Sequence, residues 1–261
     1  MDGLKWNNTG IADELVPRKA DGAAFAIPNT HDELLFMAQL AEQTERQDEM
    51  VVCMKKIVKL NSELDQNERN LLSVAYKNVL NSRRSAWRIA TSVEQQNEAE
   101  EHAPVIAALR KEFESEVAAV CEDLLGLLDS YLIPAAPKGE SKVFYLKMKG
   151  DYHRYYAEVV AGESQKKAAL DAYVQAQEMA TATLPATNPV RLGLILNLSV
   201  FYYEIMKEHK KGFDLAYAAF NDALADMDGG EGTMGDDEAY QETKLMVDLL
   251  RDNLNLWEGT A

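Results

Sequence analysis

The chain is poor in cysteine and has no long apolar run, and each shortage excludes a class of protein. Only two of its 261 residues are cysteines, Cys53 and Cys121. We therefore expect no disulfide framework and a reduced compartment, the cytoplasm. No stretch approaches the roughly 20 consecutive apolar residues that cross a bilayer. Membrane insertion is therefore not expected.

The motifs of common enzymes and metal proteins are also missing. The four histidines stand in neither a His-Glu-x-x-His zinc motif nor a Glu-x-x-His di-iron motif. There is no glycine-rich phosphate loop with a following lysine, and no Gly-x-Ser-x-Gly nucleophile turn. The sequence consequently predicts no catalytic residue, no metal site and no cofactor.

Positive charge is scarce. The chain has 43 Asp and Glu against 27 Lys and Arg, which gives a formal net charge of -16. Nucleic acid is not an expected partner, because that binding relies mainly on cations that meet phosphates. A local basic patch on the acidic chain would still bind a small anion.

What the sequence does contain is helical periodicity. Apolar residues recur at steps of three and four, and no segment alternates with a period of two. We expect an all-α protein of about nine antiparallel helices joined by short loops. The predicted organisation is a flexible extension over 1–29, one helical domain over 30–258 and a short tail over 259–261, with an acidic loop at 229–237.

Several positions predict where helices begin or pack closely. Thr30 with Glu33 and Asp65 with Glu68 have capping-box spacing, and Asn188 precedes Pro189 as an N-cap would. The first helix is expected to end near 46, the third near 98 and the seventh near 207. Gly150, inside a predicted helix over 141–160, suggests that another element packs against it.

Two segments place cations on one helical face. Lys77, Arg84 and Arg88 are seven and four residues apart, and Lys147 and Arg154 are seven apart. Such steps bring side chains to the same side of a helix. If the two faces meet, their charges form a pocket for a dianion such as a phosphate group. The alternative is two ordinary solvated helix faces.

Two asparagines lie in apolar segments near the C-terminal end. Asn197 stands among Leu196, Leu198 and Val200, and Asn253 lies between Leu249 and Leu256. An amide carries both donors and an acceptor, so each could hold the backbone of an extended peptide. Each could equally bond a neighbouring helix, with the apolar residues forming core.

Six runs along the chain resemble the 14-3-3 proteins and follow the order found in that family, over about residues 31 to 258. They are Asn67–Val79, Arg83–Arg88, Glu140–Tyr155, Arg191–Leu194, Asn197–Glu204 and Leu249–Trp257. The resemblance implies a dimeric, non-catalytic adaptor with a cup-shaped domain. An amphipathic groove in each protomer would bind phosphoserine- or phosphothreonine-containing segments of client proteins and so regulate them.

The resemblance also implies roles for individual residues. The phosphate would be bound by Lys77, Arg84, Arg154 and Tyr155, with Arg88 beside them, and the peptide backbone by Asn197 and Asn253. The groove would be lined by Lys147, Leu196, Val200, Glu204, Leu249, Leu256 and Trp257.

The seam between protomers departs from the family pattern. Arg46, Glu49 and Glu116 look retained there, but Glu112 stands where many members have lysine, and Leu109 replaces an aromatic residue. A homodimer, or a heterodimer with another family member, is still expected, with weaker association because Glu49 and Glu112 carry like charges.

Two other functions fit the residues alone. A helical-repeat scaffold would bind unmodified protein segments and show no phosphate dependence. An enzyme could hold a phosphorylated substrate in the basic pocket, but no recognisable nucleophile, base or metal set supports it.

Overall fold

The structure is a computed structural model that describes residues 27–95, 102–160, 162–229 and 238–258. Most of the predicted extension, the predicted tail and nearly all of the acidic loop lie outside these ranges. The helices are α1 (His31–Gln43), α2 (Gln47–Leu60), α3 (Gln66–Glu94), α4 (Ala103–Leu127), α5 (Ile133–Ala135), α6 (Glu140–Val159), α7 (Glu163–Thr183), α8 (Pro189–Val200), α9 (His209–Gly229) and α10 (Glu238–Glu258). The described residues contain no strand, and the predicted all-α class is confirmed.

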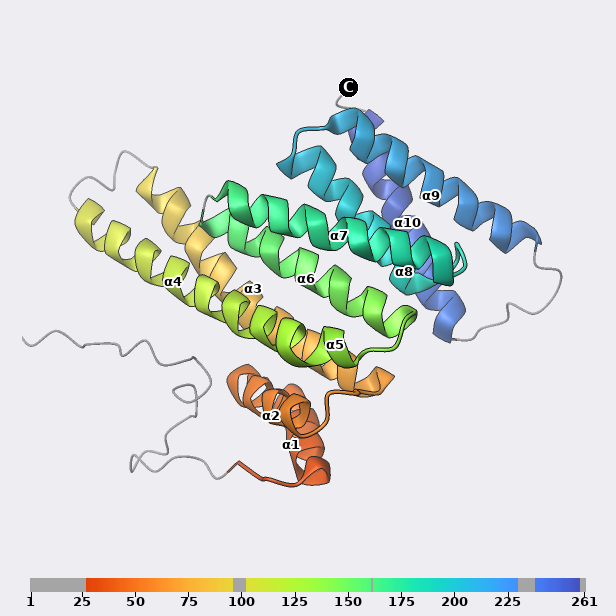
Figure 1. The fold of residues 1–261 in the computed structure, drawn as a ribbon. Coiled ribbons are helices and arrows are strands. Elements are labelled where there is room, and N and C mark those ends of the chain that lie inside the picture. The colour runs from red at the N-terminus through yellow and green to blue at the C-terminus, as the bar shows by residue number, and fades with distance from the viewer. Residues whose placement is uncertain (1–26, 96–101, 161, 230–237, 259–261) are drawn as a thin grey trace, which may run out of the picture. The chain divides into compact units, whose positions relative to one another are not determined.

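The chain divides into two compact units, each described by itself. The first comprises residues up to Ala136 together with Tyr155–Gly162, and the second comprises Pro137–Arg154 and everything from Glu163 onward. In the first unit α1 packs on α2, α2 on α3, and α3 along α4 (Figure 1). In the second, α8, α9 and α10 pack on one another and α7 packs on α8.

A buried polar contact fastens the core of the first unit. Lys55 on α2 forms an ion pair with Asp123 on α4, and the Tyr76 hydroxyl of α3 donates to the same carboxylate at 2.7 Å. The side chains of Lys55 and Asp123 are only 11% and 15% exposed. Removing one partner of such a pair is costly because it leaves a buried charge uncompensated. The contact therefore connects α2, α3 and α4.

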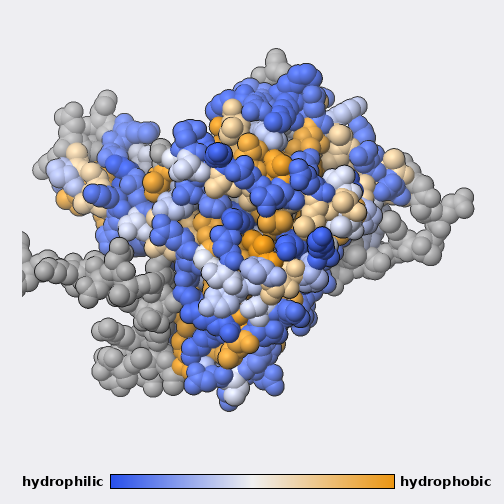
Figure 2. All heavy atoms as spheres, in the orientation of Figure 1, coloured by the Kyte–Doolittle hydropathy of each residue, from blue (hydrophilic) through white to orange (hydrophobic). Residues whose placement is uncertain are grey.

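The second unit is built on apolar packing between its last helices. Leu192 of α8, Ala216 of α9 and Leu250 of α10 are buried in one cluster, and Trp257 joins it. The Trp257 ring stacks on Tyr203 with centroids 4.3 Å apart. On the face that Figure 2 shows, hydrophilic residues cover most of α7 and α9, and apolar residues appear between them.

Gly150 has the close neighbour that the sequence predicts. A Cβ built on Gly150 would lie 2.6 Å from the Tyr173 ring of α7. Real Cβ atoms do not approach ring carbons so closely, so only glycine lets this ring lie against α6. The absence of a side chain at this position therefore helps to place Tyr173.

Two of the three predicted helix starts have the expected side-chain cap. Asp65 accepts from the Glu68 N–H at 2.9 Å, and Glu68 accepts from the Asp65 N–H at 2.9 Å. Asn188 accepts from the N–H groups of Val190 and Arg191. Thr30 is the N-cap residue of α1, as predicted, but it makes no side-chain cap bond, because its hydroxyl instead donates to the Glu33 carboxylate at 2.7 Å.

Three predicted helix ends are also too late. The first helix ends at Gln43, and Glu45 has a φ of 57°, which interrupts the helical backbone before α2 begins. The third ends at Glu94. The seventh ends at Val200 and continues as a π-helical turn over Phe201–Ile205, and Lys207, at a φ of 58°, ends the segment. Only at the third of these points do apolar residues continue past the helix end, through Phe201 to Met206, so periodicity did not reveal that break.

Candidate functional site

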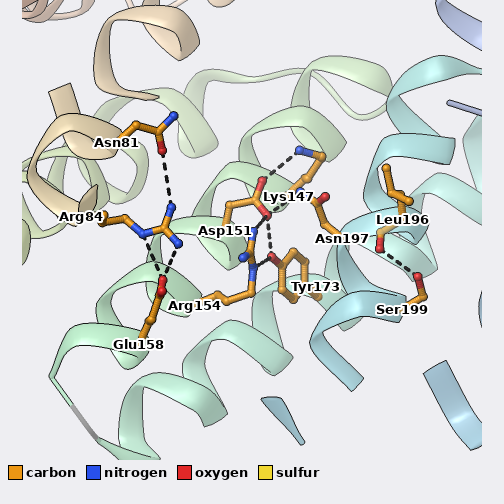
Figure 3. Close-up of polar contacts among 10 residues, drawn as sticks. All are labelled: Asn81, Arg84, Lys147, Asp151, Arg154, Glu158, Tyr173, Leu196, Asn197 and Ser199. Atoms are coloured by element: carbon orange, nitrogen blue, oxygen red, sulfur yellow. Dashed lines mark hydrogen bonds and ion pairs between the residues drawn. The ribbon is translucent and has the colours of Figure 1, made fainter. Parts of the chain in front are cut away.

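Arg84 and Arg88 of α3 are held by one carboxylate of α6. Glu158 accepts two hydrogen bonds from Arg84, the one from Nε measuring 3.0 Å (Figure 3). It accepts two more from Arg88, at 3.0 and 2.5 Å. The Arg84 side chain is 11% exposed and the Arg88 side chain 56%. Arg84 is thus a fixed cation near the surface, whereas Arg88 extends into solvent beside it.

Tyr155 and Lys77 are the other residues of the first unit that are predicted to bind phosphate. The guanidinium carbon of Arg84 lies 4.2 Å from the centroid of the Tyr155 ring, a cation–π contact. Lys77 lies on α3 two turns before Arg84, and its side chain is exposed. The structure therefore brings Arg84, Arg88 and Tyr155 together and leaves Lys77 on the same helix with its ammonium in solvent.

In the second unit a single carboxylate gathers four donors. Asp151 of α6 accepts from Lys147 at 2.9 Å and from the Tyr173 hydroxyl at 2.5 Å. It also accepts from Asn197 of α8 at 2.7 Å and from Arg154 at 3.3 Å (Figure 3). The amide nitrogen of Asn197 therefore bonds a neighbouring helix, which is one of the two alternatives that the sequence allows.

Both carboxylates are ionised at neutral pH. Burial alone would raise the pKa of Asp151, but Lys147 and Arg154 more than offset it, so the pKa lies below the usual value. Burial would likewise raise the pKa of Glu158, but hydrogen bonds from Arg84 and Arg88 outweigh it and lower the pKa. Each carboxylate therefore carries a full charge that holds its cations in place.

The residues predicted to line a groove differ in exposure. Leu249 and Leu256 of α10 are exposed, at 39% and 62%, while Leu196 and Val200 are half-buried against the apolar cluster of the second unit. Glu204 is exposed, and Asn253 is half-buried on α10. Trp257 is only 3% exposed, so its side chain packs in the core, and its role at a groove stays a prediction.

The predicted seam residues mostly form contacts within the protomer. Arg46 pairs with Glu49, and Glu116 pairs with Arg83 at 3.2 Å. Leu109 is 45% exposed, and Glu112 is also exposed. Glu49 is buried beside its arginine, so its charge is already balanced within the chain.

Three residues that organise these clusters were missed from the sequence: Asp151, Glu158 and Tyr173. For Asp151 the helical spacing held a signal, since it lies four residues after Lys147, with which it pairs. Glu158 lies four residues after Arg154, yet Arg84 and Arg88, the arginines that it binds, lie on another helix. Opposite charges at that spacing commonly pair on a helix. Spacing within one helix gives no information on a partner from another helix, so it could not identify Tyr173 of α7.

No helix in the described part of the chain is long and apolar enough to cross a membrane. Among the same residues, no group of three or more His, Cys, Asp or Glu side chains is arranged to hold a metal ion.

Comparison with known proteins gives this arrangement a family. The model of the family described as "14-3-3 protein" matches residues 37–258. A 14-3-3-like protein of Chlamydomonas reinhardtii is 53% identical over 234 residues, which cover 87% of this chain and 88% of the relative. The protein BMH2 of Saccharomyces cerevisiae is 49% identical over 235 residues, covering 87% and 84%.

A land-plant relative agrees with these two. The 14-3-3-like protein GF14 psi of Arabidopsis thaliana is 51% identical over 237 residues, which cover 88% of this chain and 91% of the relative. The family model and all three relatives extend over most of the described helices, including both carboxylate-centred clusters. The chain therefore belongs to the 14-3-3 family.

Proposed function

We propose that this chain binds phosphoserine- or phosphothreonine-containing segments of client proteins through Lys77, Arg84, Arg154 and Tyr155, with Arg88 in support. Members of the 14-3-3 family are non-catalytic adaptors that bind phosphorylated client proteins and generally form dimers. Because this chain belongs to the 14-3-3 family, its function as such an adaptor follows. Which residues bind the phosphate is the proposal.

The fixed position of Arg84 is the observation that carries the proposal. Its Nε and one terminal nitrogen face Glu158, and its other terminal nitrogen makes only a long contact of 3.4 Å with Asn81. A phosphate oxygen can replace that long contact without disturbing the bonds to Glu158. An arginine that is already oriented loses less conformational entropy on binding than a mobile one.

We further propose that the amides and apolar residues of the second unit bind the peptide around the phosphorylated residue. Asn197 and Asn253 would bond its backbone, and Lys147, Leu196, Val200, Glu204, Leu249, Leu256 and Trp257 would line the groove. The exposure of Leu249 and Leu256 supports this, because exposed leucines two helical turns apart offer an apolar surface on one face of α10.

Self-association through α1, α3 and α4 is part of the same proposal. Phe36 of α1 is 68% exposed, Ile89 of α3 is 64% and Val105 of α4 is 62%, and all belong to the first unit. Exposed apolar residues of this size favour a protein interface. Arg46, Glu49, Leu109, Glu112 and Glu116 would border it. A cytoplasmic location stays a prediction, supported by two buried and unpaired cysteines.

The experiment compares one serine-containing peptide with its phosphorylated form, using fluorescence polarisation. We expect the phosphorylated form to bind far more tightly, and Arg84→Ala to weaken it well over tenfold, because charge-assisted hydrogen bonds contribute about 1.5–3 kcal/mol each. Arg69→Ala, on the same helix, is the control for lost charge and should bind like the wild type. Equal affinity for both peptides would instead favour the scaffold for unmodified segments.

A further inference from the structure

Asp151 connects three of the proposed binding residues through one carboxylate. It contacts Lys147, Arg154 and Asn197 directly, and its side chain is only 9% exposed. A negative charge so placed is an unsuitable ligand for a phosphate, and its burial keeps it away from solvent. Its contacts therefore indicate a role exerted through its neighbours.

Both oxygens of the Asp151 carboxylate accept hydrogen bonds. Oδ2 accepts from Lys147, and Oδ1 accepts from Tyr173, Asn197 and Arg154. An ionised carboxylate only accepts hydrogen bonds, and here three donors meet Oδ1 and one meets Oδ2. The group is consequently held in one orientation, with Lys147 on Oδ2 and both charged and neutral donors on Oδ1.

Tyr173 gives Arg154 a second point of attachment. Its hydroxyl donates to Asp151 and accepts from the Arg154 Nε at 3.1 Å. Arg154 is thus held at Nε by Tyr173 and at a terminal nitrogen by Asp151, which fixes the plane of the guanidinium. Tyr173 is fully buried, and the missing side chain at Gly150 lets its ring lie against α6. Its hydroxyl therefore acts without touching a ligand in solvent.

Asp151 also decides which way the Asn197 amide faces. An ionised carboxylate only accepts hydrogen bonds, so Asn197 must turn its NH₂ group toward Asp151. Its carbonyl oxygen then points away from Asp151 and is presented as an acceptor. An acceptor at this position suits a backbone N–H of an extended peptide.

We propose that Asp151 is a positioning residue, assisted by Tyr173. It orients the Arg154 guanidinium toward the phosphate and the Asn197 carbonyl oxygen toward the peptide backbone, so that one carboxylate controls the recognition of both. This inference rests on the proposed function. The lowered pKa of Asp151 supports it, because the carboxylate stays charged wherever the family's clients are bound near neutral pH. It adds two buried residues to the binding machinery, neither of which need touch the ligand.

A double-mutant cycle tests the proposal, with a phosphoserine peptide as the probe and fluorescence polarisation as the readout. Asp151→Asn should weaken binding about tenfold, the size expected when hydrogen bonds to a charged group are lost. Asn197→Ala should also weaken it. The double variant should lose much less than the product of the two single losses, because Asn197 acts only when Asp151 orients it.

Two further variants keep the test decisive. Asp171→Asn changes the same charge on an exposed part of α7 and should bind like the wild type. Tyr173→Phe removes only the bridging hydroxyl and should weaken binding at least threefold with an unchanged circular dichroism spectrum. If Asp151→Asn does not fold, Tyr173→Phe decides alone: a loss supports the proposal, and wild-type affinity overturns it.

The wild-type protein separates the two possible failures. If it does not distinguish phosphorylated from unphosphorylated peptide, the proposed function has failed. If it does distinguish them, but Asp151→Asn binds like the wild type, only the positioning role is overturned. Multiplicative losses in the cycle would also overturn it, because they would show that Asp151 and Asn197 act independently.

Discussion

At the scale of single residues, every arginine proposed to bind phosphate already has a carboxylate partner in the protein. Arg84 and Arg88 share Glu158, and Arg154 contacts Asp151. A phosphate ligand therefore meets cations that are held in place and only partly neutralised. This explains how an acidic chain can bind an anion: the local geometry, not the net charge, determines the potential at the site.

The ion pairs of Glu158 predict a pH dependence of stability. Its pKa in the folded protein lies below the value of 4.5 for a free glutamate, so its contribution is complete above that value and disappears as the pH falls through the folded pKa. The free energy of unfolding of the wild type should therefore exceed that of Glu158→Gln at pH 7. This difference in the free energy of unfolding should become smaller as the pH is lowered.

Urea unfolding at a series of pH values measures this gap. Glu178→Gln, on α7 in the second unit, is a control for loss of one carboxylate and should show a smaller gap at pH 7. A gap between the wild type and Glu158→Gln that stays constant from pH 7 into acid would contradict the assignment of charge to these pairs.

At the scale of elements, the helix starts show that spacing alone does not make a cap. Thr30 with Glu33 and Asp65 with Glu68 have the same spacing, but only Asp65 accepts a backbone N–H. The Thr30 hydroxyl is a donor to Glu33 instead. Asp65 has no proton to donate when ionised, so its carboxylate faces the helix N–H groups.

This difference predicts unequal effects of two alanine substitutions. Asp65→Ala should lower the free energy of unfolding by about 1 kcal/mol, the usual cost of losing an N-cap. Thr30→Ala should cost clearly less, because it removes one exposed bond between side chains. Urea unfolding of both variants provides the comparison, and equal losses would show that the cap at Asp65 contributes no more than a surface contact.

At the scale of the whole molecule, the seam suggests weak self-association. Glu112 is exposed, while Arg46 and Glu116 form ion pairs within the protomer. Side chains that are already paired contribute less to a partner. Association would then depend mainly on exposed apolar residues such as Phe36 and Ile89.

Reversing the charge at Glu112 tests this view. Glu112→Lys should tighten self-association modestly, since an exposed ion pair contributes about 0–1 kcal/mol. Analytical ultracentrifugation at several concentrations measures the dimer dissociation constant. Asp222→Lys, at an exposed position of α9 in the second unit, makes the same change in net charge away from the seam residues and is the control. A looser dimer, or no change beyond that control, would count against repulsion at Glu112.

The sequence by itself determined the helical class, the caps at Asp65 and Asn188, the close approach at Gly150 and the family. Those features depend on local periodicity, on side chains that bond their own backbone, and on long runs of matching residues. The cations of the proposed site were also found, because spacing of three, four and seven identifies one face of a helix.

Only the tertiary structure decided what those cations contact. That Glu158 of α6 reaches Arg84 and Arg88 of α3, and that Asp151 joins Arg154 to Asn197 of α8, depends on which helices pack together. Helical spacing fixes the face of a side chain but not its neighbour on another helix. The partners of the buried charges therefore depend on how the helices pack against one another.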